Sequence, residues 1–326
     1  MPGFWSTNLP KLGQMTAAIA IFFAVLGAIF FIAGKANGKA QKPIAVVVFL
    51  GPALILLLFG LVGPSIRTLV LSFKDAYGNN FIGFKNYQWI FTDPDMRKVL
   101  VNTLLWFIFA PFVTTALGLF LAVLLDRMKR ESIPKSLLFL PMAISFVAAS
   151  AVWKFVYSYS NPGDPQIGLL STVVRHLGFK PSNWILTQPL NTFLLMVIFI
   201  WVQTGFGMVI LSAAIKGVPT DVLEASALDG ATGWKLFKGV TFPMVRPTVI
   251  VVFATMVATT LKLFDIVRTM TGGNFGTSVL SNEMYSEVFI YFNKGRGSAM
   301  AIVLFLFVAP ILIYNIRNLR RERTIS

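Results

Sequence analysis

Long apolar runs alternate with shorter polar stretches along the whole chain. Seven of these runs come close to the ~20 residues that a helix needs to cross the hydrocarbon core of a bilayer. Apolar runs of this length are typical of membrane-spanning helices rather than of a soluble core. We therefore expect spanning helices at residues 15–33, 44–62, 104–125, 137–157, 190–214, 248–263 and 298–316.

The composition also indicates a membrane protein. Of the 326 residues, 56% are hydrophobic and 13% are charged, and that charged share is about half of what a soluble globular domain carries. So few charges could not cover this much apolar surface in water. The pattern predicts an all-α integral membrane protein with about seven transmembrane helices.

Basic residues are unevenly divided between the two sets of loops. One set holds 15 Lys and Arg in 64 residues, and the other holds 11 in 121. Cytoplasmic loops carry an excess of Lys and Arg, so the denser set is predicted to be cytoplasmic, with the C-terminus inside and the N-terminus outside. This bias accounts for the net charge of +15 without a nucleic-acid partner. The cytoplasmic set comprises residues 34–43, 126–136, 215–247 and 317–326.

The first apolar run has the charge pattern of an uncleaved helix. Only Lys11 precedes it, whereas Lys35, Lys39 and Lys42 follow it, which reverses the charge order of a signal peptide. We interpret it as an accessory helix added to a six-helix core that begins near Ile44. The predicted division is an extracytoplasmic N-terminus, accessory helix and cytoplasmic turn at 1–43, then a transmembrane domain at 44–326 with a cytoplasmic loop at 215–247.

The residues that the chain lacks exclude several kinds of chemistry. It has no cysteine and a single histidine, His176, which excludes thiolate catalysis and multi-histidine metal sites. A phosphate-binding loop needs Gly, four residues, then Gly-Lys-Ser/Thr, and the nearest stretch, at 34–40, has the wrong spacing and no hydroxyl. We therefore expect a non-catalytic chain with no cofactor or metal of its own.

The long loop at 215–247 carries the most local structure. Pro219 followed by Thr220 or Asp221 is typical of a helix start and cap, and Gly230 is suited to end that helix. Residues 234–238 are predicted to form a second short turn before the next spanning helix. The result would be an elbow of two helices on the inner membrane face. Such an elbow would either dock another protein or only pack locally.

The same loop resembles the cytoplasmic signature of binding-protein-dependent ABC importer permeases. That signature has the order Glu-Ala-Ala, a Gly six residues after the Glu, and then Ile-x-Leu-Pro. Here Ser226, Val240 and Phe242 replace the commonest Ala, Ile and Leu. The residues that keep the pattern, and that the resemblance assigns to ATPase coupling, are Glu224, Ala225, Asp229, Gly230, Ala231 and Pro243.

Three further stretches are similar to the maltose and α-glucoside (trehalose-type) permeases, and together the resemblance covers about residues 44–320. The stretches are Phe139–Val147, Gln166–Leu170 and Phe264–Val267 with the following Thr271-Gly272-Gly273. The resemblance implies a type I importer core of six helices plus the N-terminal helix. It also implies a second permease subunit, two ATPase subunits that hold ATP and Mg²⁺, and an extracytoplasmic sugar-binding protein.

Polar and aromatic residues inside the spanning runs are candidates for the substrate path, because polar groups at membrane depth should face a cavity or a partner. A sugar fits hydroxyl and amide groups together with aromatic faces. Gly205 and Gly207 are expected to loosen the helix that carries some of them. The candidates are Ser145, Trp153, Gln203, Phe206, Thr259, Lys262 and Asp265.

Each candidate has a simpler structural role as an alternative. Ser and Thr in membrane helices commonly bond their own backbone or a neighbouring helix. Lys262 would extend toward the membrane surface, or would pair with Asp265 three residues on. Gln203 is harder to explain in this way, because a full amide at mid-membrane needs several partners.

We interpret the chain as a permease that imports an α-glucoside such as maltose or trehalose through the plasma (inner) membrane of a prokaryote. Two other classes remain open. A self-sufficient secondary transporter would need intramembrane carboxylates or inverted repeats, and no Asp or Glu lies deep in a predicted span. A membrane scaffold without transport would use the elbow as a generic docking site.

Overall fold

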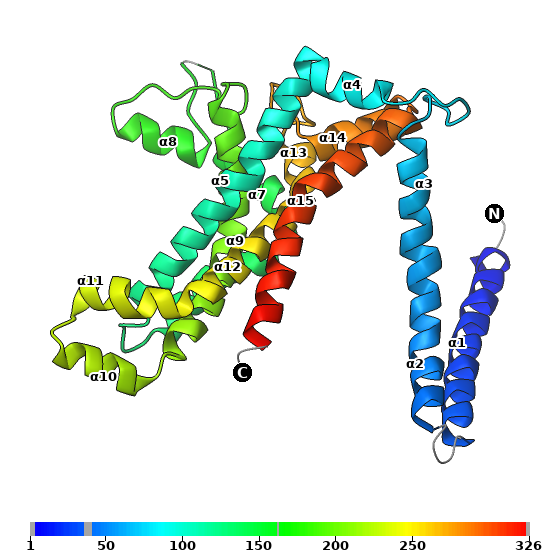
Figure 1. Ribbon diagram of the computed structural model, residues 1–326. Coiled ribbons are helices and arrows are strands. Elements are labelled where there is room, and N and C mark those ends of the chain that lie inside the picture. Colours follow the sequence, from blue (N-terminus) through cyan, green and yellow to red (C-terminus); the bar gives the residue numbers. More distant parts are fainter. Residues whose placement is uncertain (1–3, 36–40, 162, 324–326) are drawn as a thin grey trace. The chain divides into compact units, whose positions relative to one another are not determined.

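The computed structural model describes residues 4–35, 41–161 and 163–323, and within these ranges its regular elements are helices, with one antiparallel bridge between Lys74 and Phe81 (Figure 1). The chain separates into two compact units, residues 1–68 and 69–326. The predicted boundary after residue 43 falls inside the first unit and stays a prediction. Part of the predicted basic turn at 34–43 lies outside the described residues.

The first unit consists of apolar helices. They are α1 (Phe4–Lys35), α2 (Gln41–Leu57), the π-helical turn η2 (Leu58–Val62) and the start of α3 (Gly63–Leu71). The second predicted span was expected to end at 62, but the helix continues to Leu71. Ser65 and Thr68 do not break it, because their hydroxyls donate to the carbonyl oxygens of Leu61 and Pro64 at 2.7 and 2.9 Å.

The second unit begins with a short helix, α4 (Lys85–Thr92), and the long helix α5 (Pro94–Leu125). Asp93 caps α5, since its carboxylate accepts the backbone N–H groups of Asp95 and Met96 at 3.0 and 3.1 Å. This cap starts the helix ten residues before the predicted apolar run at 104.

The predicted span at 137–157 is broken rather than continuous. It is divided among α6 (Ser132–Phe139), the 3-10 turn η3 (Leu140–Ala143) and α7 (Phe146–Val156), and the two α-helices meet at 104°. Pro141 starts the 3-10 turn, and Ser145 adopts an extended backbone and caps α7 through the N–H of Ala148. A proline and a capping serine therefore override the apolar pattern.

Helix α9 (Leu190–Lys216) is central to the second unit and packs closely on α5. A Cβ atom on Gly118 of α5 would lie 3.0 Å from the Gly207 carbonyl carbon, and one on Gly205 would lie 2.8 Å from the Phe139 Cα. Small residues at membrane helix contacts allow such close approach. The expectation that Gly205 and Gly207 loosen this helix is therefore wrong: the helix is continuous, and the glycines admit its neighbours.

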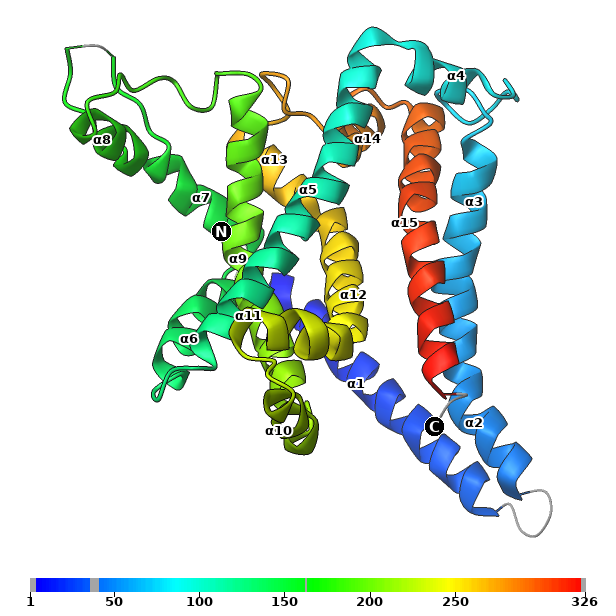
Figure 2. The same ribbon diagram turned by 60° about the vertical axis from the view of Figure 1, so that its left-hand side comes forward.

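The remaining elements alternate between the two ends of the unit. α8 follows α7, an elbow follows α9, and a nearly continuous helical stretch from Gly233 to Met270 contains the predicted span at 248–263. Figures 1 and 2 show α10 and α11 at the end opposite to α4 and α8. The elements are α8 (Leu169–His176), α10 (Thr220–Leu228), α11 (Gly233–Leu236), η4 (Phe237–Thr241), α12 (Phe242–Thr259), η5 (Thr260–Leu263), α13 (Phe264–Met270), α14 (Leu280–Tyr285), η6 (Ser286–Ile290) and α15 (Lys294–Arg323).

The largest buried cluster joins α5, α7, α9 and α13. The ring centroids of Trp106 and Phe199 lie 6.3 Å apart in an edge-to-face contact, and those of Phe146 and Phe199 lie 5.7 Å apart in a stacked contact. Ile266 of α13 belongs to the same buried cluster. Among the described residues, five helices are long and apolar enough to cross a membrane, or six if the bent pair counts as one span. The all-α membrane fold is confirmed. The predicted segment at 298–316 lies on α15, which is not among these candidate spans, so the count of seven stays a prediction.

Candidate functional site

The elbow between α9 and α12 forms as a helix with defined ends. Pro219 occupies the N-cap position of α10 with an extended backbone, and no side chain caps the helix. The prediction that Thr220 or Asp221 supplies the cap is therefore wrong, because Pro219 itself occupies the N-cap position. Asp221 lies in the first turn, where its charge favours the helix dipole.

Gly230 ends α10 in the way its position predicts. Its φ is +78°, in the left-handed region that glycine adopts without strain. The N–H of Gly230 donates to the Ala227 carbonyl at 3.0 Å, and the N–H of Ala231 donates to the Ser226 carbonyl at 3.0 Å. These two bonds form a Schellman motif. The predicted helix, its end and the turn into α11 are confirmed.

The elbow presents an exposed surface that combines apolar and acidic groups. Leu228 is 90% exposed and Trp234 is 72% exposed, and Glu224 and Asp229 are exposed beside them. Trp234 also stacks on Phe237, with ring centroids 5.2 Å apart. The surface offers groups for a partner protein as well as for local packing, so docking by the elbow stays a prediction. Of the other predicted coupling residues, Ala225 and Pro243 are exposed and Ala231 is half-buried.

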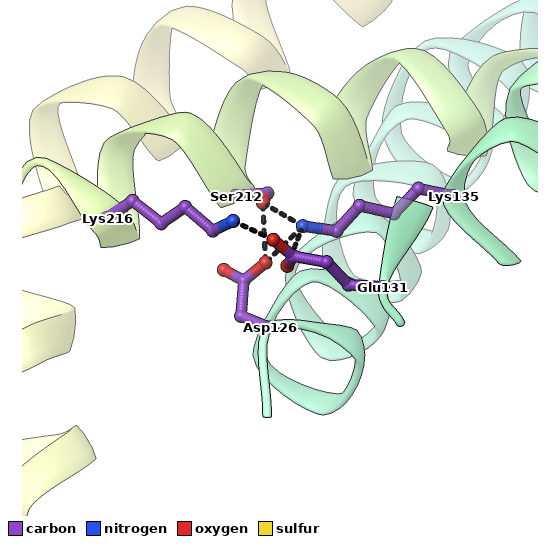
Figure 3. A network of polar contacts seen from close by, with 5 residues as sticks. All are labelled: Asp126, Glu131, Lys135, Ser212 and Lys216. Carbon is purple, nitrogen blue, oxygen red and sulfur yellow. Dashed lines mark hydrogen bonds and ion pairs between the residues drawn. The ribbon is translucent and has the colours of Figure 1, made fainter. Parts of the chain in front are cut away.

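Beside the elbow lies an ion network that the sequence reasoning missed (Figure 3). Lys135 on α6 pairs with Asp126 at the end of α5 and with Glu131, and Glu131 also pairs with Lys216, the last residue of α9. Ser212 donates to Asp126 at 2.6 Å and accepts from Lys135 at 2.6 Å. The only sign of this network in the local sequence is that Glu131 and Lys135 are four residues apart, a spacing at which oppositely charged side chains can pair on a helix.

Electrostatics hold this network in its charged form. Hydrogen bonds from Lys135 and then from Lys216 lower the pKa of the Glu131 carboxyl from 4.5 to about 2. The carboxyl is thus ionised throughout the physiological range. Its two oxygens serve different lysines, since Oε2 meets Lys135 at 2.7 Å and Oε1 meets Lys216.

Four of the predicted substrate-path residues are Gln203 on α9 and Thr259, Lys262 and Asp265 on the α12–α13 stretch. Gln203 on α9 is partly exposed, and within the described chain its amide has no hydrogen-bond partner. Lys262 on η5 is exposed and Asp265 on α13 is partly exposed, and no ion pair joins them among the described residues. Thr259 donates to the Thr255 carbonyl at 2.8 Å, the bond expected of a membrane-helix threonine.

The three other path candidates have packing roles in the second unit. Phe206 packs against the cluster of Met208 and Leu211 between α5, α9 and α12. Trp153 on α7 lies 5.1 Å from Tyr157 and 5.7 Å from Trp201, measured between ring centroids. Ser145 is the cap of α7. A role for any of the seven residues in substrate contact stays a prediction.

Comparison with known proteins identifies the family. Residues 116–323 match the family described as the binding-protein-dependent transport system inner membrane component. The chain is 49% identical over 274 residues to the osmoprotective compounds uptake permease protein GgtC of Synechocystis sp., covering 84% of this chain and 98% of that protein. It is 42% identical over 326 residues to the alpha-glucoside transport system permease protein AglF of Rhizobium meliloti, covering 98% and 93%.

A solved structure shares the fold. It is a chain of the bacterial alginate ABC transporter, crystallised in complex with an alginate pentasaccharide-bound periplasmic protein. The TM-score is 0.73 at 19% identity, covering 86% of this chain and 96% of that chain. The matched family region contains the elbow and both helices that flank it. The chain therefore belongs to the inner-membrane permease components of binding-protein-dependent ABC transport systems.

Proposed function

We propose that this chain is the permease subunit of an importer for α-glucosides of the maltose or trehalose type. The chain is a non-catalytic, multi-pass inner-membrane component of an ABC transporter. The observation that supports an α-glucoside most strongly is the 42% identity to AglF, which extends over 98% of this chain. Family membership decides against the secondary transporter and the scaffold without transport.

A second candidate substrate has its own support. The similarity to GgtC, at 49% identity over 84% of this chain, favours an osmoprotective compound. Both candidates call for the same type of path, in which neutral hydrogen-bonding groups and aromatic faces orient the substrate. The free amide of Gln203 and the paired rings of Trp153 and Trp201 suit that chemistry.

The proposed assembly contains this chain, a second permease, two ATPase subunits with ATP and Mg²⁺, and an extracytoplasmic binding protein. The binding protein would deliver substrate to the loops at 63–103 and 264–297, with the C-terminus of the permease in the cytoplasm. The elbow would dock in a cleft of one ATPase through Leu228 and Trp234, with Glu224 and Asp229 beside them. Closure of the ATPases would then move α9 and α12 and change the side on which the path is open.

The test is stimulation of ATP hydrolysis by the complete complex in proteoliposomes. The binding protein is loaded in turn with maltose, trehalose, other disaccharides and osmoprotective compounds. Stimulation by α-glucosides supports the leading proposal, and stimulation by osmoprotective compounds alone replaces it with the second. If neither class stimulates hydrolysis, both substrate assignments are wrong.

A further inference from the structure

The ion network joins three helices at one end of the second unit. Asp126 closes α5, Lys135 lies on α6, and Ser212 and Lys216 lie one turn apart at the end of α9. Figure 3 shows the two lysines approaching the carboxylates from opposite sides. The five side chains carry two positive and two negative charges, so the network is neutral as a whole.

In the inner part of the network Lys135 is fully bonded, whereas Asp126 bonds through Oδ1 and its buried Oδ2 has no hydrogen-bond partner in the described chain. The ammonium group of Lys135 has three donors, and Asp126, Glu131 and Ser212 accept them. The side chain of Asp126 is 11% exposed, and a carboxylate at that depth requires its partner. This part therefore fixes α5, α6 and α9 to one another.

The outer part of the network reaches toward the elbow. Lys216 is 50% exposed and pairs with Glu131. Only residues 217–219 separate Lys216 from α10, and Val218 between them is buried. The N–H groups of Gly217 and Val218 still donate to carbonyls of the last turn of α9, at 3.0 and 3.2 Å. A short connection that is held by backbone hydrogen bonds keeps α10 in a fixed orientation relative to the end of α9.

We propose that Glu131 and Lys216 are positioning residues for coupling, through which motion of the elbow is passed to α5 and α6 as well as to α9. This inference rests on the proposed function of the elbow as the ATPase contact. Without the Glu131–Lys216 pair, the last turn of α9 beyond Ser212 moves with the elbow, and only the inner part of the network still joins α9 to α5 and α6. ATP hydrolysis then continues with less transport for each ATP.

The experiment measures substrate imported for each ATP hydrolysed by the complete complex in proteoliposomes. Lys216→Met removes the pair and Lys216→Arg keeps a charge able to make it. Lys129→Met is the matched control, because Lys129 lies in the α5–α6 loop that carries Glu131, is exposed and has no partner in the described chain. We expect Lys216→Met to lower the ratio by about threefold, in line with the loss of a partly exposed ion pair. Lys216→Arg and Lys129→Met are expected to match wild type.

Two further measurements separate the possible outcomes. Co-purification of the ATPase subunits and the melting temperature should stay near wild type in Lys216→Met, because the inner part of the network is untouched. A ratio unchanged in both Lys216→Met and Glu131→Gln would overturn the inference. Absence of ATP-dependent import by the wild-type complex would instead overturn the proposed function.

Discussion

The close contact between α9 and the end of α6 predicts a large effect from one methyl group. In Gly205→Ala the new Cβ would lie 2.8 Å from the Cα of Phe139 and closer still to the Leu138 carbonyl oxygen. Ordinary contacts of a Cβ begin near 3.4 Å, so α6 and α9 must move apart. Overpacking of this kind costs about 1–3 kcal/mol.

Gly239→Ala is the matched control, because a Cβ at Gly239 meets nothing within 4 Å. Both variants replace a glycine inside a helical stretch, Gly205 in α9 and Gly239 in the π-helical turn η4, so their difference reports mainly the contact. At about 2–4 °C for each kcal/mol, a cost of about 1–3 kcal/mol means that Gly205→Ala should melt about 2–12 °C below Gly239→Ala. The assay is thermal denaturation of the detergent-solubilised complex. Equal melting temperatures would refute the close contact.

Three further predictions concern the elbow, the ion network and the path. Gly230→Ala places a side chain at φ +78°, which costs about 1–2 kcal/mol, so less ATPase should co-purify with the variant than with Gly239→Ala. The folded-state pKa of Glu131 is depressed from 4.5 to about 2, so its contribution is complete above pH 4.5 and is lost as the pH falls toward 2. The melting temperature of the wild type should therefore exceed that of Glu131→Gln by a constant difference between pH 8 and 5. This difference should shrink below pH 4.5. A difference that already shrinks between pH 8 and 5 would contradict the depressed pKa of Glu131. Gln203→Ala should raise the KM for transport by roughly tenfold, the value of one or two neutral hydrogen bonds, with normal assembly; an unchanged KM would remove Gln203 from the path.

The elbow was predictable because its determinants are local. Pro219 cannot continue a helix from the preceding turn, and Gly230 adopts the positive φ that ends α10 without strain. The family signature added the docking role to a helix that the residues already defined. The capping residue was mistaken because Pro219 itself occupies the N-cap.

The broken span and the ion network were harder to predict for different reasons. Pro141 was visible in the sequence, but the apolar pattern around it favoured a continuous helix, and the cap by Ser145 became evident only in the fold. The network depends on the meeting of α5 with α9, which are 86 residues apart at Asp126 and Ser212. No local pattern indicates such a pair.

The glycines of α9 illustrate the same limit. A glycine inside a helix indicates either flexibility or a close neighbour, and the sequence of one chain does not distinguish them. In the fold, Gly207 lies against Gly118 and Gly205 lies against the backbone of Leu138, so both glycines serve close packing. The substrate-path residues remain predictions, because within the described chain Gln203 and Lys262 make no side-chain hydrogen bond or ion pair that assigns them a role.

We propose that this chain supplies the path and the elbow, while separate subunits supply the energy of ATP. The most direct test is substrate uptake into proteoliposomes that contain the complete complex, with ATP or a non-hydrolysable analogue enclosed and with proton and sodium gradients imposed in turn. The account predicts uptake only with hydrolysable ATP and the binding protein. Uptake driven by an ion gradient without ATP would contradict it.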